Sequence, residues 1–332
     1  RLSLGLCLAL ACLMGCGPRS VAEAEAQRDV AWLTQYPSGD SIAALGRLAD
    51  TEPRALAALE ARAPLDINVY IAAWSAVTRN AAWGTTFLRA ALADPARADM
   101  AASALPRKDP RLTPLLPDLE GAVVRLAAGR TGSVIAGLVA SIGPPAHAAV
   151  ERRLVDAKTR GAMCDGIALP EASPDAKSAL MAVPPAARDH PSCVTAVIEM
   201  AATSDAALDW IATSGEAGLL GVAAKSTLAC PRVAAIWKKA LSERTADAAM
   251  TVPLQRSISR CSAAMDPVLA ELLAKAPRAR PTILMAIDPF GVELAGMKDT
   301  CGALKGHLGG ESAKVRERGN DALLHGCALA RR

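Results

Sequence analysis

The chain of 332 residues has a formal net charge of +4 and is 52% hydrophobic, yet only 3% of its residues are aromatic. So small a charge excess favours neither nucleic-acid binding nor strong attraction to anionic surfaces. Alanine, the best helix former, is abundant, and residues typical of strands are scarce. The composition therefore predicts an all-α protein without a nucleic-acid partner.

The first sixteen residues combine a positive start at Arg1, an apolar run from Leu4 to Met14, and a cysteine at position 16. The run is shorter than the ~20 residues that a membrane-spanning helix needs. Residues 13–16, Leu-Met-Gly-Cys, resemble the lipobox of bacterial lipoproteins. The resemblance implies that residues 1–15 are a cleaved signal peptide, that Cys16 is lipidated, and that residues 16–20 form a short tether to the membrane.

Three alternatives remain open for this leading segment. It could be an ordinary signal peptide that leaves Cys16 as a thiol, or it could be cleaved before Cys12. It could also be retained as a membrane helix, which Gly15, Gly17 and Pro18 disfavour because they end the apolar run early. For the lipoprotein interpretation we expect a bacterial cell envelope, and Gly17 in place of the Asp that retains some lipoproteins favours the outer membrane, on its periplasmic face or surface.

After a first helical segment at residues 21–35, the rest of the chain alternates helical stretches of about 10–14 residues with short breaks. Several expected helix starts place a capping residue before a proline, which lacks the N–H that would otherwise be unpaired. These starts are Asp94-Pro95, Asp109-Pro110, Ser173-Pro174 and Asp266-Pro267. Residues 134–142 are the most strand-like run, although Gly137 and Ala140 also suit close helix packing.

Residues 138–150 contain a Leu-rich helix end, then Gly143-Pro144, then an Ala-rich continuation. This stretch resembles a HEAT-type repeat, and residues 315–318 with 322–324 resemble the Arg-containing second helix of such repeats. The resemblance implies an α-solenoid of stacked helical hairpins, of which about nine with ~34 residues each would fit the chain. An irregular helical bundle is the alternative.

Nine cysteines are present, and three of them fall within residues 1–16. The remaining even number favours disulfides in an exported protein. Their successive spacings of 29, 37, 31, 40 and 26 residues alternate shorter and longer, which favours the pairs Cys164–Cys193, Cys230–Cys261 and Cys301–Cys327. Each loop would contribute ~3–4 kcal/mol of stability. Buried free thiols are the alternative.

All six of these cysteines follow residue 160, whereas most aromatic residues precede it. We therefore expect an N-terminal helical-repeat section at 21–160 and a C-terminal disulfide-stapled section at 161–332. The two sections would form parts of one array rather than independent folds.

No motif in the sequence is typical of catalysis. The four histidines lack metal-binding spacing, and Gly129-Arg130-Thr131-Gly132-Ser133 lacks the spacing and the lysine of a phosphate-binding loop. His190 is close to Cys193, but a disulfide explains that cysteine better than a catalytic pair does. Trp32, Trp74 and Trp83 could form a ligand shelf, although core packing is favoured. We therefore predict no enzyme, no cofactor and no metal site.

The leading hypothesis is an envelope lipoprotein, anchored to the membrane through lipid, that acts as a helical-repeat scaffold or protein-interaction module with at least one protein partner. One alternative is a small-ligand-binding or enzymatic lipoprotein with a pocket on the helical frame. Another is a purely structural envelope component.

Overall fold

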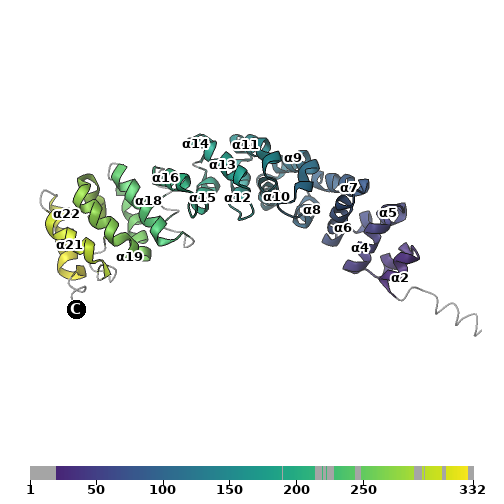
Figure 1. The fold of residues 1–332 in the computed structure, drawn as a ribbon, viewed down its shortest axis with the longest axis horizontal. Helices are drawn as coiled ribbons and strands as arrows, with labels where there is room; N and C mark the ends of the chain where they lie inside the picture. Colours follow the sequence, from purple (N-terminus) through teal and green to yellow (C-terminus); the bar gives the residue numbers. More distant parts are fainter. Residues whose placement is uncertain are drawn as a thin grey trace, which may run out of the picture. The chain divides into compact units, whose positions relative to one another are not determined.

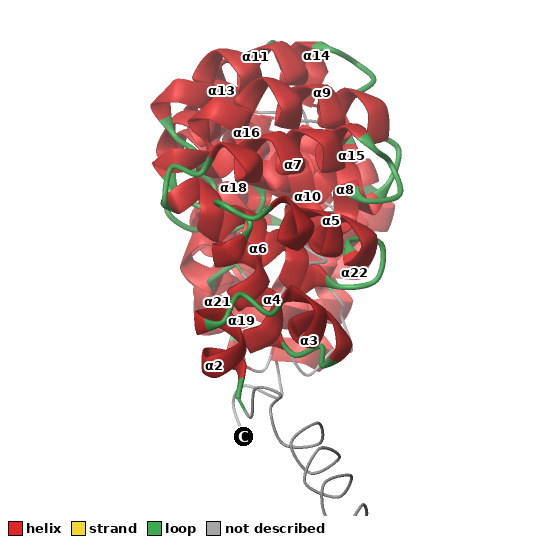
Figure 2. Ribbon diagram, turned by 90° about the vertical axis from the view of Figure 1, so that its right-hand side faces the viewer, coloured by secondary structure: helices red, strands yellow, loops and turns green. Residues whose placement is uncertain are grey.

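The computed structural model describes residues 20–188, 190–213, 219, 222, 228–243, 248–287, 294, 296–308 and 312–327. Their order along the chain can be followed in Figure 1. Within these ranges the regular elements are helices and no strand occurs, as Figure 2 shows, so the all-α prediction is confirmed. Contacts divide the chain into two units, Arg1–Gly166 with Glu171–Ala176, and Ile167–Pro170 with Lys177–Arg332.

The first unit consists of short helices joined by short turns. Its helices are α2 (Val21–Ala26), α3 (Val30–Gln35), α4 (Gly39–Leu48), α5 (Pro53–Arg62), α6 (Ile67–Thr78), α7 (Ala82–Ala93), α8 (Ala98–Ala104), η1 (Pro110–Leu115), α9 (Leu116–Leu126), α10 (Arg130–Ser141), η2 (Pro144–Ala146), α11 (His147–Val155), most of α12 (Arg160–Ile167) and the start of α13 (Pro174–Ala182).

Alternate helices of this unit lie side by side. Helix α4 contacts α6, α6 contacts α8, and α8 contacts α10, so these helices form one layer, whereas α7 and α9 contact each other in a second layer. Neighbours in a layer run in the same direction, because Gly39 lies beside Asn68 and Gly46 lies against Ala72. Consecutive helices in the chain contribute to opposite layers.

Small residues allow the layers to approach closely. A Cβ atom at Gly84 of α7 would lie 2.5 Å from the carbonyl oxygen of Ala73 in α6, so the backbones meet where only glycine fits. Gly143 has φ of 89° and turns the chain between α10 and η2, a conformation that residues with a Cβ rarely adopt. The strand-like run at 134–142 lies in α10 and its end, and residues 138–150 form a helix–turn–helix.

Two of the expected helix starts in this unit are confirmed and one is wrong. The Asp109 carboxylate accepts a hydrogen bond from the Arg111 amide at the start of η1, and the Ser173 hydroxyl accepts one from the Ala176 amide at the start of α13. Asp94 instead ends α7. Its carboxylate accepts from the Ala96 amide, so Asp94 holds a turn and α8 begins only at Ala98.

The second unit continues with further helices, of which the described α-helices range from the four residues of α14 to the 25 residues of α19. They are the rest of α13, α14 (Pro185–Arg188), α15 (Pro191–Met200), α16 (Asp205–Thr213), α18 (Cys230–Glu243), η3 (Ala248–Met250), α19 (Thr251–Lys275), η4 (Pro277–Ala279), α20 (Arg280–Ala286), α21 (Lys298–His307), α22 (Ala313–Asp321) and η6 (Ala322–Gly326). Helix α18 contacts α16 and α19, and α19 contacts α21.

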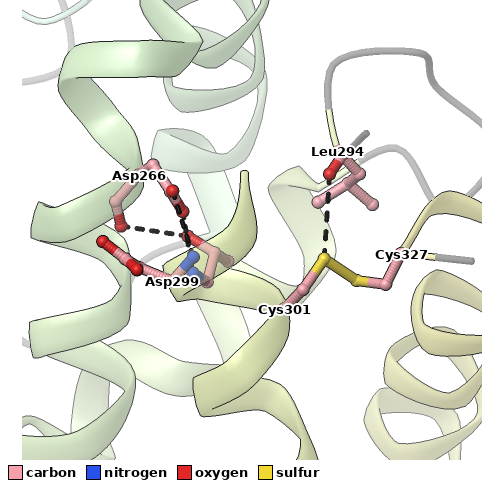
Figure 3. The surroundings of a disulfide bond; sticks show 6 residues. Asp266, Leu294, Asp299, Cys301 and Cys327 are labelled. Atoms are coloured by element: carbon pink, nitrogen blue, oxygen red, sulfur yellow. Dashed lines mark hydrogen bonds between the residues drawn. A yellow bond between two sulfur atoms is a disulfide. The ribbon is translucent and has the colours of Figure 1, made fainter. Parts of the chain in front are cut away.

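The helix start expected at Asp266-Pro267 is wrong, because both residues lie inside α19. The break in this helix is at Cys261, where φ of −130° and ψ of 33° leave the helical region. The buried Asp266 carboxylate caps another helix: it accepts hydrogen bonds from the amides of Asp299 at 3.1 Å and Thr300 at 2.7 Å, at the start of α21 (Figure 3). Asp266 therefore caps a helix that neighbours it in space and not the helix predicted to start at Pro267.

Disulfides join helices of the second unit. Cys230 at the start of α18 is bonded to Cys261 at the break in α19, with Cα atoms 5.2 Å apart. Cys301 in α21 is bonded to Cys327, just after η6, with Cα atoms 5.7 Å apart (Figure 3). These are the pairs that the spacing favours. Cys164 and Cys193 are also disulfide-bonded, and their pairing with each other stays a prediction.

Replacing Gly84 by alanine is expected to lower the free energy of unfolding by about 1–3 kcal/mol, because the new methyl group forces α6 and α7 apart. Urea denaturation would measure the loss. The matched control is Gly121→Ala on α9, where a Cβ meets only the end of the flexible Arg125 side chain at 3.2 Å. That change should be neutral or stabilising by up to about 1 kcal/mol. Equal effects of both substitutions would contradict the packing account.

Replacing Asp266 by alanine is expected to cost about 1–3 kcal/mol, because it leaves the Asp299 and Thr300 amides without their acceptors. Hydrogen exchange of a peptide covering residues 298–307 should become faster. Thr300→Val serves as the control, since it removes only the hydroxyl bond to the Asp266 carbonyl oxygen and keeps both amide bonds. Exchange in α21 that is unchanged in Asp266→Ala would show that the cap is dispensable.

Candidate interaction surface

Side-chain hydrogen bonds between residues distant in the sequence span 22 to 64 residues along the chain, and one range of separations recurs among them. Separations of 32 to 34 residues join the following pairs: Gly46 and Arg79, Asp50 and Trp83, Leu92 and Arg125, Asp99 and Thr131, Glu120 and Arg152, Ser133 and Asp165, Lys238 and Glu271, Asp266 and Thr300. Shorter separations of 29 residues also occur, from Arg79 to Asp50 and from Arg89 to Asp118. In the first unit, the bond from Arg125 to Leu92 joins α9 to α7, and the bond from Thr131 to Asp99 joins α10 to α8, so these two links run between neighbours in one layer.

Glu120 of α9 is the most fully paired carboxylate of these links. Arg152 of α11 donates to both of its oxygens, at 3.0 and 2.9 Å, and Arg153 lies 3.2 Å away. The hydrogen bonds from Arg152 lower the pKa of Glu120 despite the opposing effect of burial, and the charges of both arginines add to them. Arg47 of α4 likewise lowers the pKa of Glu25 in α2 through two hydrogen bonds of 2.6 Å.

An apolar edge of the first unit consists of Trp32, Tyr36, Leu65, Ile67 and Ile71. Tyr36 is 52% exposed, Leu65 88%, Ile67 38% and Ile71 48%. The Trp32 and Tyr36 rings contact each other at a centroid distance of 4.9 Å, with their planes tilted by 38°. Such exposure of large apolar side chains in close succession distinguishes this edge from a typical solvated helix surface.

Contacts between the helices and turns that carry these side chains bring their ends together. The Arg62 guanidinium at the end of α5 donates to the Thr34 carbonyl oxygen near the end of α3, at 3.1 Å. The Leu65 amide then donates to the Arg62 carbonyl oxygen in the turn to α6. Gly39 at the start of α4 lies beside Asn68 at the start of α6. The ends of α3 and α5 and the starts of α4 and α6 therefore meet at this edge.

A shallow hollow of about 140 Å³ lies between α4 and α6, next to the edge. Its floor is made of small residues, among them Ala43 and Ala72, and Ile71 stands at its rim. Arg47 and Arg79 also line it, but their guanidinium groups are engaged by Glu25 and Asp50. The hollow extends the apolar edge without adding an unpaired charge.

A larger cavity of about 520 Å³ lies in the second unit, between the ends of α18 and α19. Leu241 and Leu272 form part of its wall, and Lys238, Lys275 and Arg278 contribute positive charge. Glu271 also lines the cavity and pairs with Lys238 at 2.6 Å and with Lys275 at 3.3 Å. Hydrogen bonds from these two lysines lower the pKa of Glu271.

The tryptophans have different roles in the structure. Trp74 is buried, with the Arg111 guanidinium 5.8 Å from its ring centroid, which fits the core role. Trp83 is partly exposed, donates to the Asp50 carboxylate at 2.8 Å, and packs on Phe87. Within the described ranges no ring contact joins Trp32, Trp74 and Trp83, so the ligand shelf is not formed there.

The candidate residues for catalysis or phosphate binding have structural roles in the described part of the chain. The His190 ring nitrogen caps α15 through the Ser192 amide, and Cys193 is disulfide-bonded. Residues 129–133 form the turn into α10. The part of the chain that the structure describes contains no cluster of metal-ligating side chains. It also contains no helix that is both long and apolar enough to span a bilayer.

The signal peptide predicted at residues 1–15, the predicted lipidation site Cys16 and most of the predicted tether at 16–20 lie outside the described residues. The apolar edge and the cavity were not predicted from the sequence. Ile67 and Ile71 are four residues apart on α6, a spacing that the sequence alone assigns equally well to a buried face.

The stability of the first unit is expected to fall as the pH drops below about 4.5, the ordinary pKa of a glutamate, and Glu120 should contribute to this fall. A carboxylate with a lowered pKa stabilises the fold fully above its ordinary pKa of 4.5, and the contribution is lost as the pH falls through the lowered value. Glu120→Gln should therefore flatten the pH dependence of the urea midpoint between pH 7 and acid.

The matched control carries Arg152→Met and Arg153→Met, which remove the partners of Glu120. In that background Glu120→Gln should no longer flatten the pH profile, because only the opposing effect of burial on the pKa of Glu120 remains. An equal flattening in both backgrounds would mean that the arginines are not the cause.

Comparison of the chain with protein-family models, with curated proteins and with solved structures finds no match. We therefore base the functional proposal on the contacts, burial and charge of the described residues and on the resemblances in the sequence.

Proposed function

We propose that this protein is a bacterial envelope lipoprotein, anchored through a lipid on Cys16, that serves as a scaffold or protein-interaction module. In this proposal the described helices belong to an α-solenoid of HEAT-like hairpins. Such arrays bind partners along the extended surface of one layer, because each hairpin adds a similar strip of side chains to it.

The observation that supports this proposal best is the recurrence of hydrogen bonds between residues 32 to 34 apart. A stacked array requires such links, since each unit contacts mainly its neighbours. The parallel course of alternate helices in the first unit supports the same arrangement.

The anchor is supported by the lipobox resemblance and by the position of the first helix. Ser20 lies only four positions after Cys16, and its side chain caps α2 by accepting a hydrogen bond from the Glu23 amide. A chain of this length reaches at most ~14 Å. The helical body would therefore work directly at the membrane.

A photocrosslinking amino acid placed in each layer tests the scaffold. Ser103 is exposed on α8 in one layer, and Val124 is 47% exposed on α9 in the other. In membranes of the native host we expect defined protein adducts from one of these positions and not from the other, because partners of a stacked array use one face. Separation by electrophoresis and mass spectrometry would identify the adducts.

The Cys16→Ala protein is the control for the anchor. It should appear in the soluble fraction and lose the adducts, because it no longer concentrates at the membrane. Recovery of Cys16→Ala in the membrane fraction would refute the lipid anchor. Identical adducts from both layers would contradict a face-specific scaffold.

The alternative of a small-ligand-binding lipoprotein is favoured by one observation, the cavity of about 520 Å³ between α18 and α19. Its volume suits a small molecule, and its lysine and arginine side chains could hold an acidic group. Absence of protein adducts from both layers would favour this alternative over the scaffold.

A further inference from the structure

We propose that the apolar edge, formed by Trp32, Tyr36, Leu65, Ile67 and Ile71, rests against the lipid bilayer and fixes how the first unit stands on the membrane. This inference rests on the proposed anchor at Cys16 and extends it: the lipid tethers the chain, and the edge orients it.

The exposed large apolar side chains of the first unit are concentrated at its N-terminal end. Tyr36, Leu65, Ile67 and Ile71 lie within the first five described helices or the turns between them. Two others, Val124 and Val155, lie on α9 and α11, farther along the chain. The apolar edge is therefore the part of this unit that gains most by leaving water.

The chemistry of the edge suits the boundary between headgroups and acyl chains. Tryptophan and tyrosine favour this zone because each has an apolar ring and a polar group that stays hydrated. Leu65 and Ile71 supply aliphatic surface that can enter the upper acyl region, as the apolar faces of interfacial helices do. Aromatic and aliphatic side chains are combined here at a single end of the helices.

The charges around the edge indicate which lipid surface it suits. Asp40 and Asp66 stand at the starts of α4 and α6, and Arg62 at the end of α5 is engaged by the Thr34 carbonyl oxygen. Because basic residues are not in excess, attraction to anionic lipid is not the driving force. The edge should bind zwitterionic bilayers, and added salt should change this binding little.

The length of the tether supports the bilayer as the occupant. From a lipid on Cys16 the chain reaches Ser20 within ~14 Å. Helix α2 then contacts α4, and α4, with ten residues, is only about 15 Å long. The bilayer is therefore held beside the apolar edge. A short linker gives a high effective concentration, so even weak apolar contacts between the edge and the lipid form. A free protein partner has no such advantage.

The test uses the lipidated full chain in phosphatidylcholine vesicles with brominated acyl chains, which quench tryptophan fluorescence on contact. Trp32 reports on the edge, and the same measurement on Trp32→Phe gives the contribution of the other tryptophans. We expect Trp32 of the otherwise unchanged protein to be quenched. Leu65→Ser with Ile71→Ser should reduce quenching to the Trp32→Phe level.

The matched control is Val124→Ser with Val155→Ser, which removes two exposed apolar side chains of 47% and 64% exposure from elsewhere in the unit. It should retain full quenching, and circular dichroism should confirm that both double variants fold. Equal quenching in the two variants, or none in the original protein, would overturn the proposal, as would a protein adduct from a photocrosslinker at Leu65 in native membranes.

Failure of the anchor is distinguished by a second arm. A chain that starts at residue 17 and carries an N-terminal histidine tag is bound to the same vesicles through a nickel-chelating lipid, so its attachment does not depend on Cys16. Quenching of Trp32 in this arm supports the edge even where Cys16→Ala shows that the native chain is not lipidated. If Trp32 is quenched in neither arm, the proposed contact between the apolar edge and the bilayer is wrong, and the lipid anchor is unaffected by this result.

Discussion

The structure depends on the close approach of helices whose surfaces carry alanine and glycine. Each helix is too short and its side chains too small to bury much apolar area alone, so stability comes from contacts with neighbours on several sides. Gly46 against Ala72, and Gly166 against the Ala136 backbone, are places where this approach excludes any larger residue. Polar links between helices then set their alignment along the layer. Because the chain uses mainly small residues, few large apolar side chains are present at the described surface.

Much of the fold class could be predicted because helix propensity and capping are local properties. The scarcity of strand-forming residues predicted an all-α chain, and Asp109 and Ser173 were recognised as caps from their own neighbourhoods. Asp94 and Asp266 show the limit of this method. The same residue types hold a turn or cap a distant helix, and that choice is made by tertiary packing.

The candidate surfaces could not be predicted for a related reason. Whether Ile71 is buried or exposed depends on which helix covers it, and its four-residue spacing from Ile67 is compatible with both outcomes. The cavity between α18 and α19 depends on how two helix ends diverge, which no spacing in the sequence records. Cysteine spacing was more informative, because a disulfide requires two particular residues to lie within a narrow range of distances.

The recurring separation of the interhelical links also bears on how such a chain can change its length. A deletion that begins at Asp99 and ends just before Thr131 would put Thr131 of α10 where Asp99 of α8 now lies. The layer would be kept, and small residues would still pack against small residues. A deletion of about half that length would exchange the layers and turn buried alanines toward water. In the proposed stacked array, the chain could therefore be lengthened or shortened by whole periods, and packing would disfavour intermediate lengths.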